Sequence, residues 1–272
     1  MNDVEPELDL SIVIPAYKEG KKIERDVLAA QAFLTKYALN AEIIVVDDGS
    51  PDDTALRAYR LSPEVPQLRV LSYAPNRGKG HALRFGISRA RGRTIMFADA
   101  GLCVPFDIAI LGIVMLESGM CDIAHGSRRM RGSILVPQPW LRRVGSRGFS
   151  VLIHTVIGIP WYISDTQCGF KLYKREVAQA LYGAIFTDGM MFDIEVVLRA
   201  LRAHFKILEF PVLWSNDPDS RYDPLRGGAI ATLRELWGIR RGLSGRRQVV
   251  PKADVVERSA RPAASATEPH TT

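Results

Sequence analysis

The fold is decided by the stretch Glu42-Ile43-Ile44-Val45-Val46-Asp47-Asp48-Gly49-Ser50-Pro51. Its apolar run carries β-branched residues without polar alternation, which indicates a strand buried on both faces, as in a parallel sheet. Two acids and a glycine follow. Ser50 before Pro51 is typical of a helix start, because a serine oxygen caps the first turn and proline fits within it. The stretch therefore predicts a buried strand over 42–46, a polar turn, and a helix over 51–61.

The same alternation of short apolar runs and longer helical patterns recurs on both sides of this stretch. Further buried strands are expected at 10–14, 68–72 and 94–98, with helices at 21–39 and 79–91. Strand, helix and strand at this spacing indicate right-handed βαβ units, and hence an α/β protein with a mostly parallel central sheet flanked by helices. The second half is less regular. Its pattern predicts helices at 149–157, 192–204 and 230–243 and a strand at 207–212.

Length and composition are those of an ordinary globular protein. The chain has 272 residues, of which 47% are hydrophobic and 24% charged, and a chain of this size folds without disulfide or metal staples. Its three cysteines include no Cys-x-x-Cys pair, which argues against a disulfide framework and a zinc ribbon. The acidic start lacks the basic and apolar regions of a secretion signal, so we expect a cytoplasmic protein.

The domain organisation is expected to be simple. One α/β domain is predicted over residues 10–245, after a short N-terminal extension at 1–9. From 246 to 272 the composition turns to Ala, Ser, Thr, Pro and charge, which predicts a disordered tail. No predicted segment approaches the ~20 apolar residues that span a bilayer.

The positive charge of the chain is unevenly spread. The stretch 125–148 carries six arginines and no acid, and the stretch 221–247 carries seven arginines against two acids, a net +5. Because the total is +6, the rest of the chain carries −5. Such patches are either solvated surface or binding surface for nucleic acid, an anionic membrane or a phosphorylated ligand. They lack the interleaved aromatic residues of a single-strand platform, which disfavours nucleic acid.

Polar residues follow each of the first four predicted strands. Because ligands bind beyond the carboxyl ends of parallel strands, these residues are expected to form a polar ligand pocket at one sheet edge. Each segment alone is also explained as a turn or a helix cap. Neither a Gly-x-Gly-x-x-Gly turn nor a P-loop occurs, which disfavours a dinucleotide site and NTP hydrolysis. The segments are Pro15-Ala16-Tyr17-Lys18-Glu19-Gly20, Asp47-Asp48-Gly49-Ser50, Asn76-Arg77-Gly78-Lys79-Gly80 and Asp99-Ala100-Gly101.

These segments, in this order, resemble the motifs of family-2 glycosyltransferases, and similar motifs continue along the chain. The later ones are Gly126-Ser127-Arg128, Asp165-Thr166-Gln167-Cys168-Gly169-Phe170-Lys171, Phe192-Asp193-Ile194-Glu195 and Pro211-Val212. Together they are most similar to the branch of dolichyl-phosphate β-glucosyltransferases and polyprenol-phosphate glycosyltransferases. The resemblance covers residues 10–243, nearly everything but the expected tail.

The resemblance implies a GT-A fold and an inverting transfer from a nucleotide sugar, with UDP-glucose preferred, to a polyprenyl-type lipid phosphate. It also implies a Mg²⁺ or Mn²⁺ ion, and a peripheral place on the inner, anionic face of a membrane. The matched donor positions are Pro15, Tyr17, Glu19, Asp47, Asp48, Lys79, Asp99 and Ala100, with Asp99 as the metal ligand. The matched acceptor positions are Arg128, Arg129 and Gln167 as phosphate ligands and Asp165 as a catalytic acid or base, with Arg128 as an electrophilic clamp.

Two positions depart from the family pattern. Lys18 stands where the family has asparagine, and Gly101 stands where the metal-binding Asp-x-Asp has its second acid. A glycine supplies no carboxylate, so the metal site is expected to be weakened, although Mg²⁺ binds with one or two carboxylates plus phosphates. The alternatives are a catalytically impaired sugar-nucleotide-binding protein and a transferase that acts on a soluble or glycolipid acceptor.

Overall fold

Seven strands form one sheet in the order β3-β2-β1-β4-β7-β5-β8, and β6 and β9 form a separate two-stranded ladder. This is a computed structural model, which describes residues 8–135, 148–215 and 229–245. The strands of the main sheet are β1 (Leu10–Ala16), β2 (Ala41–Asp48), β3 (Leu68–Tyr73), β4 (Thr94–Ala98), β5 (Ile123–Ser127), β7 (Phe170–Lys174) and β8 (Ile207–Pro211). The short strands are β6 (Ile134–Leu135) and β9 (Leu213–Trp214).

The sheet is mostly parallel, as predicted. Strands β1, β2, β3 and β4 run in one direction, and β5 pairs with β8 in parallel. Strand β7 lies between β4 and β5 and is antiparallel to both. The sequence pattern did not predict β5 or β7, so it did not predict this reversal.

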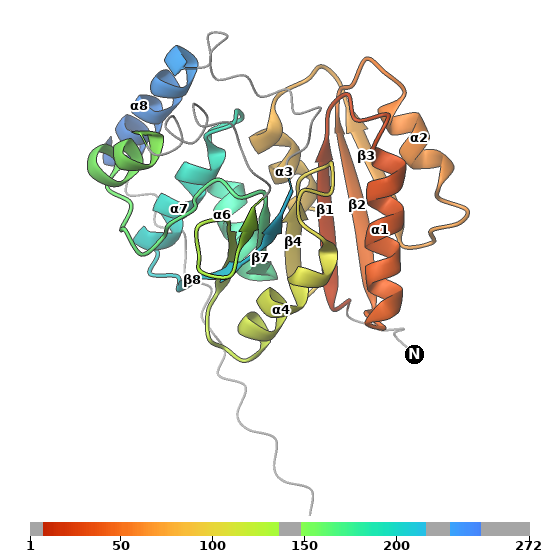
Figure 1. The fold of residues 1–272 in the computed structure, drawn as a ribbon. Coiled ribbons are helices and arrows are strands. Elements are labelled where there is room, and N and C mark those ends of the chain that lie inside the picture. Colours follow the sequence, from red (N-terminus) through yellow and green to blue (C-terminus); the bar gives the residue numbers. More distant parts are fainter. Residues whose placement is uncertain (1–7, 136–147, 216–228, 246–272) are drawn as a thin grey trace, which may run out of the picture.

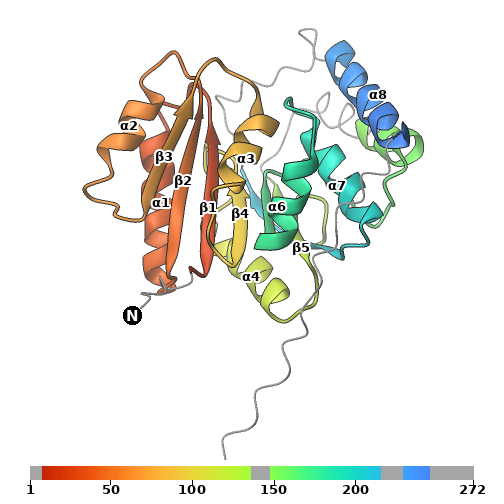
Figure 2. The ribbon, with the colours of Figure 1, turned by 180° about the vertical axis from the view of Figure 1, so that it is seen from behind.

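Helices cover both faces of the sheet (Figures 1 and 2). One layer consists of α1 (Ile23–Lys36), α2 (Thr54–Arg60) and α4 (Ala109–Glu117), which follows the short 3₁₀ turn η1 (Phe106–Ile108). The other consists of α3 (Lys79–Ile87), α6 (Arg175–Ala184) and α7 (Phe192–Arg202), with α8 (Ala229–Gly245) outside α7. Because successive strand residues point to opposite faces, Ile12 and Ile14 join the first core and Val13 joins the second.

Three local predictions are wrong. The helix α2 begins at Thr54 rather than at Pro51, and the Ser50 hydroxyl accepts the Lys18 N–H at 2.9 Å instead of capping a helix. Strand β3 is not fully buried, because it is the edge of the sheet. The predicted helix at 149–157 begins as α-helix over 148–152 but continues as the π-helical turn η2 (Ile153–Ile157).

Several predictions lie outside the described residues: most of the N-terminal extension, the tail at 246–272, and the arginines at positions 142, 143, 147, 221, 226, 246 and 247. Within the described ranges, no helix is both long enough and apolar enough to cross a membrane.

Candidate active site

The carboxyl ends of β1, β2 and β4 meet at one edge of the sheet. Strand β1 lies between β2 and β4, so the strand order reverses there, and such a switch point is where open α/β sheets bind ligands. Ala16 is in register with Asp47, and Pro15 lies inside β1 opposite Val46. The sequence prediction that these segments share one edge is therefore confirmed.

Asp47 has a buried carboxylate with spare hydrogen-bonding capacity. Its Oδ2 accepts the Ser50 N–H at 3.3 Å, while its buried Oδ1 has no hydrogen-bond partner among the described residues. A buried carboxylate oxygen normally has a donor, so this one suits a donor on a ligand. Tyr17 lies half-buried at the same edge with the Lys18 ammonium 5.1 Å from its ring centroid, and Glu19 pairs with Lys22 at 3.6 Å.

Asp48 organises the neighbouring loop instead of facing an open pocket. Its carboxylate accepts hydrogen bonds from the Tyr73 hydroxyl, the Asn76 amide and the backbone N–H groups of Arg77 and Gly78, each at 2.8 Å. Both oxygens are therefore occupied within the chain. Asp48 thus fixes the loop that leads to Lys79, and the direct donor contact expected from the resemblance stays a prediction.

Lys79 and Asp99 form the centre of the donor side. Lys79 is the first residue of α3, and its Nζ lies 2.5 Å from Asp99 Oδ1. Burial disfavours the charged lysine, but the carboxylates of Asp99 and Asp193 outweigh it and raise the pKa of Lys79. An ammonium at the positive end of a helix dipole suits the phosphates of a nucleotide.

Gly169, the residue before β7, leaves space for the Asp99 side chain. The Gly169 carbonyl accepts the Asp99 N–H at 2.9 Å, and a Cβ at position 169 would collide with the Asp99 carboxylate. Behind this contact, the fully buried Lys171 Nζ donates to Asp193 Oδ1 at 2.6 Å. Negative and positive charges thus alternate from the site into the core, in the order Asp99, Lys79, Asp193 and Lys171.

Gly101, which stands where the family pattern has the second acid, makes a backbone hydrogen bond to Asp26. Gly101 has a φ of +105°, which side chains rarely adopt, and its N–H donates to Asp26 Oδ2 at 2.6 Å. Burial raises the pKa of Asp26 above its ordinary value. Among the described residues, no group of three or more His, Cys, Asp or Glu side chains is placed to hold a metal. Asp99 is the residue here that fits a hard cation, as a single carboxylate ligand. Ala100 beside it packs against the core and offers no side-chain oxygen.

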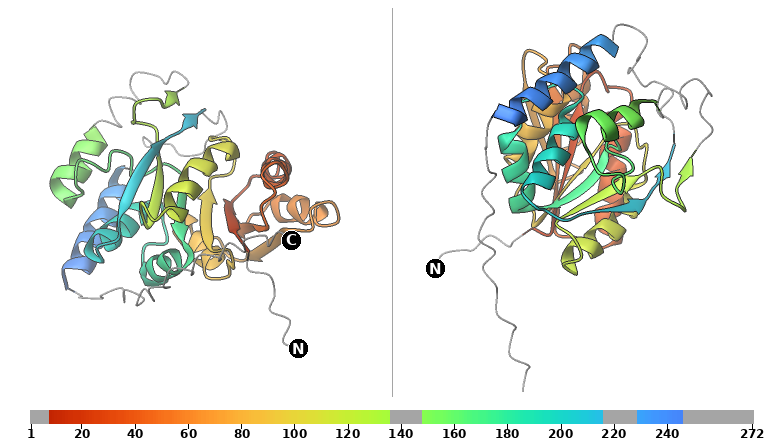
Figure 3. Two further views of the ribbon diagram at one scale, coloured as in Figure 1. Left: turned by 90° about the horizontal axis from the view of Figure 1, so that it is seen from below. Right: turned by 90° about the vertical axis from the view of Figure 1, so that its left-hand side faces the viewer.

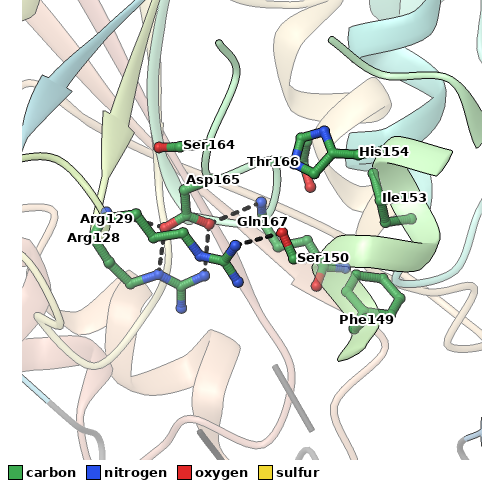
Figure 4. A pocket seen from close by; sticks show the side chains of 10 residues that line it. All are labelled: Arg128, Arg129, Phe149, Ser150, Ile153, His154, Ser164, Asp165, Thr166 and Gln167. Atoms are coloured by element: carbon green, nitrogen blue, oxygen red, sulfur yellow. Dashed lines mark hydrogen bonds and ion pairs between the residues drawn. The ribbon is translucent and has the colours of Figure 1, made fainter. Parts of the chain in front are cut away.

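A second cluster surrounds Arg128, which follows β5 (Figure 4). Its Nε and Nη2 donate to the two oxygens of Asp165 at 2.7 and 2.8 Å, and its backbone N–H donates to Oδ2 at 3.0 Å. Burial raises the pKa of Asp165, but the Arg128 guanidinium outweighs it and lowers that pKa to about 2. With both oxygens bound to Arg128, Asp165 is a weaker proton acceptor than an ordinary aspartate. It holds Arg128 in place, and the general-base role expected for it stays a prediction.

The pocket around this ion pair is polar on one side and apolar on the other (Figure 4). Arg129 Nη1 donates to the Ser150 hydroxyl at 2.5 Å, and the Gln167 N–H donates to Asp165 Oδ1 at 3.3 Å. Residues that the sequence reasoning did not assign complete the lining; they are Phe149, Ser150, Ile153, His154, Ser164 and Thr166. The apolar periodicity at 149–157 was the signal for Phe149 and Ile153, but it did not reveal that they face Arg128.

The segment 164–171 connects the two sides. Asp165 and Gln167 line the pocket, and two residues later Gly169 lies against Asp99. Burial lowers the pKa of the Arg128 guanidinium, but Asp165 outweighs it and raises that pKa, and Asp99 is near enough for its charge to add to the increase. Asp99, predicted on the donor side, and Arg128, predicted on the acceptor side, thus lie near each other.

Exposed apolar side chains adjoin the pocket. Helix α8 buries Leu236 and Ile239 but exposes Leu233 and Trp237, with the Arg241 guanidinium 3.9 Å from the Trp237 ring centroid. The segment 148–162 exposes further apolar side chains, namely Val151, Val156, Trp161 and Tyr162. The two elements lie side by side (Figures 1 and 3), joined by a 2.8 Å hydrogen bond from Arg240 Nη1 to the Val156 carbonyl. Arg240 and Arg241, from the second basic stretch, therefore lie beside this exposed apolar surface.

Known proteins resemble this chain along most of its length. Dolichyl-phosphate beta-glucosyltransferase of Saccharomyces cerevisiae is 34% identical over 252 residues, covering 86% of this chain and 75% of the relative. The Homo sapiens protein of the same name is 32% identical, covering 80% and 71%. Glycosyltransferase AglD of Haloferax volcanii is 32% identical over 85% of this chain, which spans 38% of AglD.

The fold is shared with solved glycosyltransferases. Glucosyl-3-phosphoglycerate synthase from Mycobacterium tuberculosis in complex with phosphoglyceric acid superposes with a TM-score of 0.64 at 18% identity, covering 86% of this chain and 80% of that one. Its complex with Mn²⁺, UDP and glucosyl-3-phosphoglycerate gives a TM-score of 0.59 at 19% identity, covering 86% and 76%. The family model for glycosyl transferase family 2 matches residues 11–182. With the sheet edge, the ordered motifs and these likenesses in agreement, the chain belongs to glycosyl transferase family 2 and is a transferase with the GT-A fold.

Proposed function

We propose that this enzyme transfers glucose from UDP-glucose to a polyprenyl-type lipid phosphate, with inversion, at the inner surface of a membrane. The names of its relatives support this acceptor and this sugar, since the yeast and human proteins are dolichyl-phosphate beta-glucosyltransferases. The proposed domain is residues 10–245, with the donor bound at the β1–β2–β4 edge and the acceptor at the Arg128 pocket.

The observation that carries the proposal is the composition of the acceptor pocket. Arg128 is partly buried and held by Asp165, Arg129 lies beside it, and Phe149 and Ile153 add apolar side chains to the lining. Two guanidinium groups suit a phosphate, because planar N–H donors pair with its oxygens. The segment that supplies these apolar residues also exposes Val151 and Val156, and apolar surface of this kind suits the hydrocarbon chain attached to that phosphate.

The donor side supports a nucleoside diphosphate. Asp47 offers its unpartnered oxygen to a donor group on the nucleoside, and the ammonium of Lys79, at the start of α3, suits the diphosphate. We propose that Asp99 holds Mg²⁺ or Mn²⁺ together with the donor phosphates. Such a cation neutralises the charge of the leaving diphosphate.

The geometry supports a direct displacement that needs no protein base. A phosphate oxygen of the acceptor attacks the anomeric carbon of the sugar, and the bond from that carbon to the diphosphate breaks. A phosphate monoester is largely a dianion near neutral pH, since its second pKa is near 6. Arg128 and Arg129 orient the nucleophile, Asp165 fixes Arg128, and Lys79 stabilises the departing UDP.

A membrane location is supported by the surface beside the pocket. Exposed Trp161, Tyr162 and Trp237 with nearby Arg240 and Arg241 have the composition of an interfacial surface, where aromatic rings insert and arginines meet anionic headgroups. A lipid phosphate at such a surface lies close to the Arg128 pocket.

The test is product formation from radiolabelled UDP-glucose, undecaprenyl phosphate and Mg²⁺ in detergent. Transfer to the lipid is expected, with kcat/KM reduced by roughly 10²–10³ in Arg128→Lys, which keeps a charge but loses the bidentate pair. Arg60→Lys, on the exposed end of α2, is the matched control and is expected to behave as wild type. Turnover on phosphoglyceric acid but on no lipid phosphate would establish a soluble acceptor instead, and UDP binding without any transfer would establish the impaired binding protein.

A further inference from the structure

The loop at 185–191, between α6 and α7, lies directly on the turn that carries Lys79. The Asp188 carbonyl accepts the N–H groups of Gly80 at 2.8 Å and His81 at 3.3 Å. A Cβ at position 78 would collide with the Asp188 carbonyl, and one at position 80 with the Thr187 carbonyl. The loop and the turn therefore touch backbone to backbone, and a shift of the loop moves the lysine turn.

Two carboxylates from different helices hold this loop. Glu195 of α7 accepts the N–H groups of Phe186 at 3.2 Å and Thr187 at 2.9 Å. Glu235 of α8 accepts the Met191 N–H at 3.0 Å, and a Cβ at Gly189 would collide with its carboxylate. Glu195 thus binds the start of the loop, and Glu235 binds its end.

The end of the loop reaches both sides of the site. Gln167 of the acceptor pocket has its Nε2 3.6 Å from the Met191 sulfur. The next residue, Phe192, has its ring centroid 5.7 Å from Lys79 Nζ. Met191, which Glu235 holds, thus lies next to Gln167 on the proposed acceptor side. The residue after it, Phe192, lies next to Lys79 on the proposed donor side.

Helix α8 does not depend on Glu235 for its own attachment. Leu236, Ile239 and Leu243 bury it in the core, and Arg202 Nη1 donates to the Leu243 carbonyl at 2.7 Å. Loss of the Glu235 carboxylate therefore removes the anchor of the loop at Met191 while α8 stays docked. The remaining anchors are Glu195 and Arg84, which binds the Ile185 carbonyl and the Asp188 carboxylate.

We infer that Glu235 is a positioning residue that links α8 to the donor and acceptor sides through the loop 185–191. As a role in sugar transfer, the inference rests on the proposed function; as a link between α8 and the Lys79 turn, it stands on the contacts alone. The helix that presents Leu233 and Trp237 outward is then also the helix that sets the Lys79 turn.

The test measures backbone amide exchange by mass spectrometry in Glu235→Ala. Exchange at Met191 is expected to rise, and exchange at Gly80 and His81 is expected to rise roughly tenfold with it, because the loop that accepts their N–H groups loses its anchor at Met191. Glu235→Gln keeps an acceptor oxygen and is expected to restore wild-type exchange. Glu176→Ala, an exposed acid on α6, is the control and is expected to change neither segment.

A second measurement uses UDP with MgCl₂ in calorimetry and the KM for UDP-glucose. Glu235→Ala is expected to weaken UDP binding and raise this KM about tenfold, because a preorganised site is lost, while the thermal midpoint changes little. Wild-type exchange at Gly80 and His81 in Glu235→Ala overturns the inference, whatever UDP does. Absence of UDP binding by the wild-type protein overturns the proposed donor instead, and the exchange result still decides the link.

Discussion

Lys18 is strained in the turn after β1. Its φ is +56°, in the left-handed region, and its side chain is exposed. A lysine there costs roughly 1 kcal/mol, whereas asparagine adopts this conformation more readily. We expect Lys18→Asn to raise the free energy of unfolding by about 0.5–1 kcal/mol, measured by urea denaturation at 25 °C. Lys21→Asn, two residues before α1 at an exposed site without positive φ, is the control, and an equal gain there would contradict the explanation.

Asp165 gives the enzyme a pH dependence of stability. Its pKa is lowered from 3.8 to about 2 because Arg128 outweighs the opposing effect of burial. A lowered carboxyl pKa stabilises the fold above the unfolded-state value near 4, and this contribution is lost as the pH falls towards 2. We expect Asp165→Asn to be less stable by about 2 kcal/mol at pH 7, with the difference from wild type shrinking between pH 4 and pH 2.

Chemical denaturation across that range measures the difference. Asp53→Asn, whose carboxylate pairs with Arg57 at an exposed site, is expected to stay within about 0.5 kcal/mol of wild type at every pH. If the difference in unfolding free energy between wild type and Asp165→Asn stayed constant from pH 7 to pH 2, Asp165 would not be the source of the pH dependence.

At the scale of elements, Gly169 sets the geometry between β4 and β7. A Cβ there would displace the Asp99 carboxylate, whereas a Cβ at Gly183 in α6 meets open space. We expect Gly169→Ala to lower glucosyl transfer by roughly a hundredfold and to weaken its stimulation by Mg²⁺. We expect Gly183→Ala to keep full transfer and to gain about 0.5–1 kcal/mol of stability, because alanine favours a helix interior. Steady-state transfer assays and urea denaturation measure both variants, and normal Mg²⁺ stimulation in Gly169→Ala would contradict the assignment of Asp99.

The sequence predicts the elements that follow local rules. Strands β1, β2 and β4 are apolar runs, and their positions and shared edge are correct because parallel strands buried on both faces need such runs. Strand β7 carries Lys171 in a fully buried position, which apolar patterns exclude, and β5 buries His125 and Ser127. The partner that permits Lys171 is Asp193, 22 residues further along the chain. Local periodicity contains no information on that contact.

The same distinction holds for the site. Sequence motifs indicated Asp99, Lys79, Arg128 and Asp165 because these residue types bind cations and phosphates. Motifs did not reveal how Asp165 is used, since that depends on a bidentate pair with Arg128, 37 residues away. Nor did they reveal that Asp48 is occupied by its own loop. Residue identity predicts chemistry, and tertiary contacts decide which atoms are left to perform it.

At the scale of the whole molecule, charge is expected to direct the enzyme to a membrane. Arg240 and Arg241 lie on the surface that exposes Trp237, and each basic residue near an anionic leaflet contributes about 1 kcal/mol. We expect Arg240→Glu with Arg241→Glu to weaken binding to phosphatidylserine vesicles by more than about tenfold, measured by co-sedimentation at low salt. Arg60→Glu on α2, at the far end of the molecule in Figure 1, is the control, and an equal loss there would show that only net charge matters.

The place of β7 also bears on how the chain folds during synthesis. The strands β3, β2, β1 and β4 are neighbours and are complete once residue 98 has left the ribosome. Strand β5 pairs with β7 and β8 but not with β4, so it has no place on the growing sheet until β7 is made. Because N-terminal parts fold first during translation, the nucleotide half is expected to form early, and the exposed edge of β4 waits for about seventy further residues. Until β7 pairs with it, that open strand edge is where we expect the nascent chain to be most prone to aggregation.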